Sequence, residues 1–367
     1  MALQGGKIAA ILAVAIIIIA AVAAVAVTNG NNNNSDGEKT VTDMRGRTVS
    51  LPNSVDKVVC LSAGSLRLVE YMGAVDKVVG IDSKDSEETA NYYKATYHIA
   101  FNTRGITNVG SADSFSKIMA TGADVIITSN TDVGELNKLQ DNTNIPVVGI
   151  NAEGNVTVGG DTFNENIRLL GKVLGKESRA EELINGVSSI VKELTDMKEK
   201  STKTKDTKCY VGGMFYYMKG DLYRTSGNFE PFTLTGVTNV MEVRDGNPYD
   251  TEAKEIINAK PDYIFVDSIK ITDSKTQYET DLKAYAEVPA VNDGNIYSLY
   301  VEKYYGTNWE SELMNAYYIG NIIDPSAFDC DAEAKANQIL SLFYPGSDIT
   351  VDDLVEKQGS GAGKLVW

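Results

Sequence analysis

One pattern occurs twice in this chain: a helical segment, a tight turn, an aspartate and then a buried strand. The first copy is Lys117–Ile127 and the second is Glu255–Phe265. Such units occur in any α/β protein, and strands that alternate with helices at this spacing predict parallel sheets covered by helices on both faces. The two copies stand on either side of the segment Ser178–Lys200. We therefore predict an α/β fold with two similar lobes.

The segment Ser178–Lys200 predicts a long amphipathic helix that joins the two lobes. Ser178 and Glu181 have the spacing of a capping box at its start, and Gly175 is expected to end the preceding helix. At 1.5 Å per residue the helix would span roughly 34 Å, about the width of a small domain. Its apolar side chains recur at a period of 3.6 residues: Ala180, Leu183, Ile184, Val187, Ile190, Val191, Leu194 and Met197.

The predicted organisation of the 367-residue chain follows from this bridge. From the N-terminus it comprises a transmembrane anchor or signal segment (1–27), a flexible linker (28–39), an N-terminal α/β lobe (40–177), the bridging helix (178–200), a C-terminal α/β lobe (201–357) and a tail (358–367).

The N-terminal segment Ile8–Val27 carries no charged residue and is long enough to cross a bilayer as a helix. Lys7 precedes it and Asp36 follows the span, so most of the chain should lie outside the membrane. We predict a retained anchor through residues 8–27 and an extracytoplasmic protein at the cell surface. The alternative is a signal peptide, whose cleavage would release a secreted protein.

Composition excludes some classes of protein. The net charge of −16 argues against nucleic acid as a partner, because phosphates require clustered Lys and Arg. Cys60, Cys209 and Cys330 lie far apart, so they signal neither a zinc site nor a disulfide framework. An enzyme is disfavoured too, since no Gly-x-Ser-x-Gly, P-loop or His-Glu-x-x-His sequence occurs.

From Val41 to about Asp353 the chain resembles extracytoplasmic substrate-binding proteins of ABC importers for iron chelates, haem and cobalamin. The resemblance lies in the order of several short motifs over some three hundred residues. These are Thr42–Val49, Lys57–Ser62, Val78–Asp82, the strand entries Ala123-Asp124 and Pro261-Asp262, and Asn315–Gly320.

The resemblance implies two Rossmann-like lobes with parallel sheets, joined by one helix, with ligand held in the cleft between them. It implies capture of an iron chelate (a siderophore complex or haem) or a corrinoid, and delivery to an ABC permease with its cytoplasmic ATPase. No cofactor is expected. Two alternatives stay open: a non-transport ligand sensor or adhesin on the same scaffold, and a chelatase-like enzyme.

In doubly wound lobes the ligand lies outside the carboxyl ends of the parallel strands. Serines there offer hydrogen bonds, tyrosines and tryptophan offer rigid contact area, and arginines can clamp carboxylates. The alternative for each aromatic residue is packing against a sheet. The candidate ligand-binding residues are Ser62, Ser65, Tyr97, Arg104, Ser129, Tyr216, Tyr217, Arg224, Tyr300, Tyr304, Tyr305 and Trp309.

His98 is the only histidine in the chain. A direct site for zinc, manganese or free iron usually needs several converging His or carboxylate ligands, so we expect no metal site. His98 is either a surface or hydrogen-bonded residue, or an axial ligand to haem or cobalt.

The chain departs from the resembled family at the positions used for permease docking. The family usually carries a glutamate seven residues before each strand-entry Pro-Asp, and this chain has Ser116 and Lys254 there. We therefore assign docking to nearby carboxylates, which are Asp113, Glu252 and Glu255.

Overall fold

In the computed structural model, each copy of the repeated pattern forms a helix followed by a strand of a parallel sheet. The structure describes residues 39–367 except 87–91, 104, 153–155, 217 and 245–247. The predicted anchor, nearly all of the linker, Arg104 and Tyr217 lie outside these residues. Within the part of the chain that is described, no helix is both long and apolar enough to cross a membrane. The described residues belong to one compact unit, Glu38–Trp367.

The aspartate of each copy explains why the pattern repeats. The Asp124 carboxylate accepts the backbone N–H of Lys57 at 2.8 Å, and the Asp262 carboxylate accepts that of Lys208 at the same distance. Lys57 and Lys208 stand at the start of the neighbouring parallel strand in their sheets. An aspartate at the strand entry therefore satisfies a backbone donor of the adjacent strand, once in each sheet.

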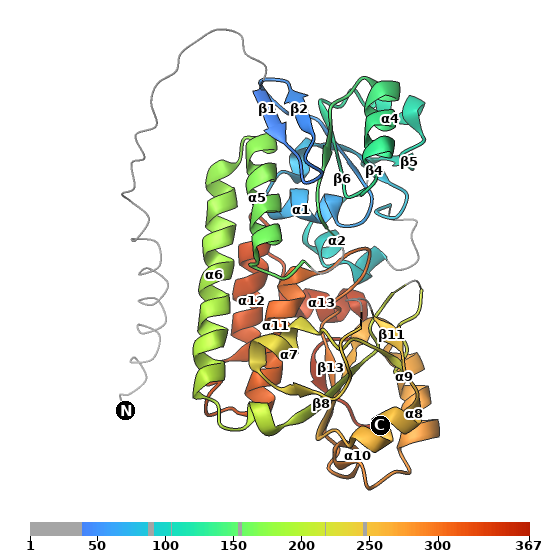
Figure 1. The fold of residues 1–367 in the computed structure, drawn as a ribbon, viewed down its shortest axis with the longest axis vertical. Coiled ribbons are helices and arrows are strands. Elements are labelled where there is room, and N and C mark those ends of the chain that lie inside the picture. The colour runs from blue at the N-terminus through green and yellow to red at the C-terminus, as the bar shows by residue number, and fades with distance from the viewer. Residues whose placement is uncertain (1–38, 87–91, 104, 153–155, 217, 245–247) are drawn as a thin grey trace, which may run out of the picture. The chain divides into compact units, whose positions relative to one another are not determined.

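Sheet I is parallel throughout, with strand order β5-β4-β3-β6-β7. Its strands β4, β5 and β6 are labelled in Figure 1. Its strands are β3 (Val58–Leu61), β4 (Val78–Asp82), β5 (Thr107–Gly110), β6 (Val125–Thr128) and β7 (Val147–Gly149). The helices of this half are α1 (Ser65–Tyr71), α2 (Tyr97–Ala100), α3 (Phe115–Ala120), α4 (Val133–Thr143) and α5 (Asp161–Leu174). An antiparallel hairpin of β1 (Lys39–Thr42) and β2 (Thr48–Leu51) precedes them.

Sheet II has strand order β10-β8-β12-β13-β14 and is parallel except at one edge. Its strands are β8 (Lys208–Gly212), β10 (Thr238–Asn239), β12 (Tyr263–Asp267), β13 (Ile296–Leu299) and β14 (Gly363–Lys364). A separate antiparallel pair is β9 (Arg224–Thr225) with β11 (Tyr249–Asp250). The helices are α7 (Glu230–Thr235), α8 (Ala253–Ala259), α9 (Ile271–Gln277), α10 (Pro289–Asn292), α11 (Trp309–Ile323), α12 (Ala332–Phe343) and α13 (Val351–Gln358).

Residues 358–367 are not a free tail. Their strand β14 pairs with β13 in the antiparallel sense and extends sheet II by one edge strand. Ser298 of β13 fixes this segment, because its hydroxyl donates to the Gly363 carbonyl at 3.2 Å. The predicted sheets are otherwise parallel, as the alternation of strands and helices indicated.

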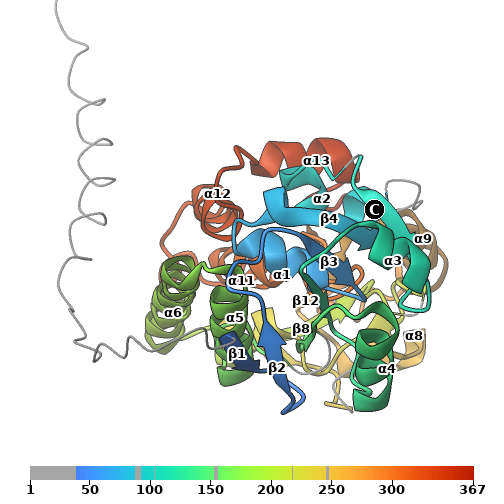
Figure 2. The ribbon, with the colours of Figure 1, turned by 90° about the horizontal axis from the view of Figure 1, so that it is seen from above.

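The predicted bridging helix is α6 (Glu177–Lys200), which connects α5 to the first strand of sheet II. It packs beside α5 at one flank, and α12 lies next to it (Figure 2). The predicted apolar stripe faces the core, whereas the predicted capping box at Ser178 is wrong. The helix starts one residue earlier, and the Glu181 carboxylate instead accepts a hydrogen bond from the Arg168 guanidinium of α5 at 2.8 Å.

One hydrophobic core cluster extends over both halves of the protein. It joins Val58 of sheet I and Leu183 of α6 to Trp309 and Leu340 of α11 and α12. Three further clusters lie on the faces of the two sheets. The two halves are therefore connected by packed apolar side chains as well as by one helix.

Two helical glycines test this packing. A Cβ at Gly320 in α11 would overlap the buried ring of Phe328, whereas a Cβ at Gly186 in α6 would lie 2.7 Å from the flexible end of Leu342. We expect Gly320→Ala to lower the free energy of unfolding by about 1–3 kcal/mol, the usual effect of overpacking. Gly186→Ala should be neutral or stabilising by up to about 1 kcal/mol, because alanine favours helix. Urea denaturation of both variants measures the difference, and equal effects would contradict the predicted packing.

Candidate functional site

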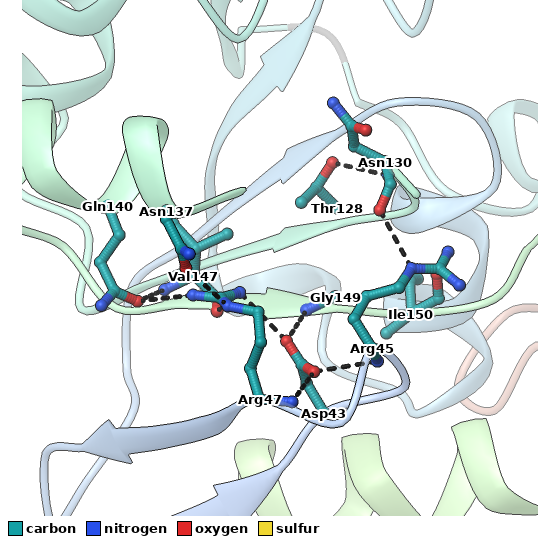
Figure 3. A network of polar contacts seen from close by, with 10 residues as sticks. All are labelled: Asp43, Arg45, Arg47, Thr128, Asn130, Asn137, Gln140, Val147, Gly149 and Ile150. Atoms are coloured by element: carbon teal, nitrogen blue, oxygen red, sulfur yellow. Dashed lines mark hydrogen bonds and ion pairs between the residues drawn. The ribbon is translucent and has the colours of Figure 1, made fainter. Parts of the chain in front are cut away.

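The β1–β2 hairpin holds the loops at the carboxyl ends of two strands of sheet I. Figure 3 shows Asp43 accepting the backbone N–H groups of Arg45 and Arg47, at 2.9 Å each, and that of Gly149 at 3.1 Å. The Arg45 guanidinium donates to the carbonyls of Asn130 and Ile150 at 3.2 and 2.9 Å. The turn from the Thr42–Val49 motif therefore fixes the loops that follow β6 and β7.

The loop between β3 and α1 contains two of the predicted site residues. Ser62 has a positive φ of 67°. Its N–H donates to Asp82 at 2.7 Å, and its half-buried hydroxyl lies 3.1 Å from that of Thr128. Ser65 is fully buried, and its hydroxyl donates to the Leu61 carbonyl. Ser62 is thus placed where a ligand could reach it, whereas Ser65 already has its partner inside the protein.

The segment that follows β13, in the sheet II half, contacts helix α1 of the sheet I half directly. Arg67 of α1 is fully buried, and its guanidinium donates to the carbonyls of Tyr304 and Tyr305 at 2.8 and 3.3 Å. The Tyr305 hydroxyl donates to the carboxylate of Asp82 at the end of β4. We call these four residues the inter-sheet contact. Burial raises the pKa of Asp82, while the hydrogen bonds from Tyr305 and from the backbone lower it.

Four other predicted residues are engaged within the protein. Tyr97 is fully buried and donates to Asp85 at 2.6 Å. Trp309 is fully buried against Phe163, and its indole N–H donates to a backbone carbonyl. Tyr300 is 6% exposed, and burial raises its pKa to about 12. The Ser129 hydroxyl donates to a carbonyl of the β3–α1 loop.

Tyr216 and Arg224 lie together near the β9–β11 pair. The Arg224 guanidinium is 5.6 Å from the centre of the Tyr216 ring, and it donates to Asp250 at 2.7 Å. This arrangement pairs an arginine with a carboxylate and an aromatic face. The exposed Asp250 is the group that a ligand carboxylate would have to replace.

His98 is a buried, hydrogen-bonded residue. Its Nδ1 lies 2.8 Å from the Tyr92 carbonyl, its ring stacks on that of Tyr92 at 3.9 Å, and its Nε2 is 3.3 Å from Asp85. A side chain enclosed in this way has no open face for the iron of haem or the cobalt of a corrinoid. In the described ranges no group of three or more His, Cys, Asp or Glu residues is arranged to hold a metal ion.

The predicted docking carboxylates lie at two helix starts. Glu252 and Glu255 form a capping box at the start of α8, and Lys254 forms an ion pair with Glu252 at 2.7 Å. Asp113 is exposed and lies 3.5 Å from Lys138. Glu252 and Glu255 therefore contribute to helix capping, and a permease would contact carboxylates that already have local partners.

A cavity of about 30 Å³ is lined by Lys303 and Thr307, which flank the tyrosines of the inter-sheet contact in the sequence. Thr157, which precedes α5, lines it from one side. Side chains from the sheet II half line the other sides, chiefly Ser226, Glu230, Glu302, Thr307 and Glu312. The lining is oxygen-rich and carries more carboxyl groups than cations, since Lys303 is the lysine among the lining residues.

Sequence reasoning did not select Arg67, Asp82, Glu302 or Glu312 as site residues. Arg67 sits in a helix whose every residue is buried, and Asp82 ends a motif that marked the resemblance. Glu302 lies inside the segment from Tyr300 to Trp309, which was selected for its aromatic side chains, and Glu312 follows that segment in α11.

The comparisons with known proteins agree with this architecture. The family model described as periplasmic binding protein matches residues 58–301. The molybdate-binding protein MolA of Haemophilus influenzae is 21% identical over 332 residues, which cover 84% of this chain and 91% of MolA. Its molybdate-bound structure has a TM-score of 0.67 and covers 85% of this chain and all of that one, at 18% identity.

Two further solved structures show the same fold. A periplasmic solute binding protein from Veillonella parvula has a TM-score of 0.68 at 20% identity, covering 88% of this chain and 99% of that one. The periplasmic heme binding protein HutB of Vibrio cholerae has a TM-score of 0.54 at 15% identity, covering 73% and 99%. At these identities the likeness establishes the fold and leaves the ligand open.

The inter-sheet contact predicts a specific effect of Tyr305→Phe. Loss of a hydroxyl bond to a carboxylate should lower the free energy of unfolding by about 1.5 kcal/mol. Tyr223→Phe is the matched control, because its hydroxyl donates to Asp281 within the sheet II half at 2.7 Å. Only Tyr305→Phe should increase hydrogen exchange in α1 and the β3–α1 loop. Equal exchange in the two variants would contradict the role assigned to Tyr305.

Asp267 predicts a pH dependence of stability. Burial raises its pKa from 3.8 to about 8, although it accepts backbone N–H groups of Glu302 and Ile269. A raised pKa in the folded state makes the native protein bind the extra proton, so the contribution of Asp267 to stability is greatest at low pH and is lost as pH rises towards 8. We expect a slope of about −1.4 kcal/mol per pH unit between roughly pH 4 and 8. Denaturation of Asp267→Asn over this range should lack that slope, and an identical slope would refute the assignment.

Proposed function

The chain belongs to the periplasmic binding protein family, and we propose that it captures a small ligand beside the inter-sheet contact and delivers it to an ABC permease. The observation that supports this proposal is that strand-end loops of sheet I meet the segment after β13 of sheet II through a few polar contacts. Breaking those contacts would admit a ligand, and re-forming them would enclose it. Family membership implies an extracytoplasmic location.

The finer features of the proposal extend the sequence predictions. Residues 8–27 would anchor the protein in the membrane, and the permease would be powered by a cytoplasmic ATPase. Among the predicted ligand residues, Ser62, Tyr304 and Tyr305 are the best placed, because they lie at or next to the inter-sheet contact. Since α6 is a single helix and the core is shared, opening should be modest.

The proposed cargo is an iron chelate, haem or a corrinoid. The similarity to a molybdate-binding protein adds an oxyanion as a rival. The cavity lining weighs against the oxyanion, because Glu230, Glu302 and Glu312 would face it with one lysine nearby.

A second candidate function is a non-transport ligand sensor on the same scaffold. Ser116 and Lys254 favour it, since a permease that docks on glutamates would meet a hydroxyl and a cation. In α8 the neighbouring Glu252 and Glu255 are joined in the capping box.

A binding panel tests the proposal. Ferric siderophores, haem, cobalamin and molybdate are titrated into residues 38–367, and saturable binding of one chelate or corrinoid is expected. Absence of binding across the panel would count against ligand capture, and saturable binding of molybdate alone would replace the cargo. Co-purification of the full chain with a permease separates transport from the sensor function, since a sensor would bind ligand without a permease.

A further inference from the structure

Two buried carboxyl groups belong to residues that line the same cavity. Glu302 follows β13 and Glu312 lies in α11, and each side chain is 5% exposed. Their carboxyl groups are within hydrogen-bonding reach of each other. Among the described residues, the Oε2 atom of each has no hydrogen-bond partner although it is buried. Both residues line the cavity.

Glu310, two residues before Glu312 in α11, shows what a carboxyl group with a purely structural role looks like here. It is fully buried too, and it accepts hydrogen bonds from the hydroxyls of Tyr71 and Tyr344, the latter at 2.9 Å. Packing therefore supplied partners for both Glu310 oxygens. The Oε2 atoms of Glu302 and Glu312 lack such partners, as do both carboxyl oxygens of the buried Glu70, but Glu302 and Glu312 also line the cavity.

The charge of the pair is set by its surroundings. Two carboxyl groups in contact and away from water cannot both ionise easily, so they share a proton. Burial raises the pKa values of Glu302 and Glu312, and the adjacent carboxyl raises that of Glu312 further. The charged groups that face the pair are Glu230 of α7, Glu310 of α11, Asp267 of β12 and Lys303.

The chemistry that fits this cavity is a small cation that donates hydrogen bonds. A bare metal ion would require more ligands than a carboxyl pair, and no group of three metal-binding side chains is arranged for one in the described part of the chain. An ammonium or guanidinium group needs only acceptors within reach, which the pair, Ser226 and Thr307 offer. A cavity of about 30 Å³ has room for a group the size of one or two waters.

We propose that Glu302 and Glu312 form a subsite for a cationic N–H group of the ligand. This inference rests on the proposed capture of a ligand at this position, and it narrows the cargo to molecules that carry such a group. Binding displaces the shared proton to solvent, and the two carboxylates then accept the N–H donors. Binding should therefore strengthen as pH rises.

The test uses methylammonium as the probe and ligand-observed saturation-transfer NMR, which suits weak binding of a small molecule. Tetramethylammonium is the matched control, because it has the same charge and no N–H donor. The full chain is compared with Glu302→Gln, Glu312→Gln and Glu199→Gln, the last an exposed glutamate at the end of α6. Glutamine resembles the protonated carboxyl, so thermal midpoints close to that of the parent chain are expected for all three.

We expect saturable methylammonium binding that weakens at least tenfold in Glu302→Gln and Glu312→Gln and is unchanged in Glu199→Gln. Tetramethylammonium should bind at least tenfold more weakly. Absence of saturation, equal binding of the two cations, or an equal loss in Glu199→Gln would overturn the subsite. If the cargo panel binds while these results fail, only the subsite is refuted; if neither binds, ligand capture itself is refuted.

Discussion

The structure depends on one buried cation, the guanidinium of Arg67. Removing a charged group from water costs several kcal/mol unless hydrogen bonds replace the lost hydration. Arg67 meets most of this requirement with carbonyls of a segment more than two hundred residues away, and it lies 4.7 Å above the Tyr97 ring, although its buried Nε has no hydrogen-bond partner. In this closed arrangement, the hydrogen bonds of the Arg67 guanidinium therefore depend on the segment after β13 lying against α1.

That requirement explains the unusual backbone of this segment. Tyr305 has a φ of 48°, which is rare for a residue with a side chain and costs of order 1–3 kcal/mol. The next residue, Gly306, has a φ of 98°, and a Cβ there would lie 2.6 Å from the Arg67 guanidinium. The hydrogen bonds to Arg67 and Asp82 compensate for the strain. A tyrosine followed by glycine is thus what this close approach of two halves demands.

The sequence predicted those features that depend on local periodicity. Alternating strands and helices, the aspartate at each strand entry and the apolar stripe of α6 all follow from spacing, and the structure has them. The start of α6 could not be predicted in the same way. Gly175 adopts the left-handed conformation that ends α5, and the helix restarts at once, so Ser178 already lies inside the first turn.

The site residues were harder to predict because their roles arise only from tertiary contacts. In the sequence, Arg67 and Glu70 resemble solvent-facing positions of an amphipathic helix, yet all of α1 is buried. The side chains that burial places beside them come from the chain around Tyr97 and Glu310. The spacing of residues within α1 therefore does not predict these tertiary contacts.

The acidic residues of the chain likewise fall into two groups, exposed and buried, which composition alone does not distinguish. Most of the described carboxylates lie at least partly exposed, whereas Glu302, Glu310 and Glu312 are buried around the start of α11. The positive end of that helix dipole favours negative charge in its first turn. Glu310, which has two tyrosine partners, and Glu312 of the carboxyl pair both lie in this first turn, whereas Glu302 precedes the helix. The first turn of α11 therefore holds one carboxyl group, Glu310, whose hydrogen-bond partners come from the protein. It also holds Glu312, whose Oε2 has no such partner and is available to a ligand donor in the proposed subsite.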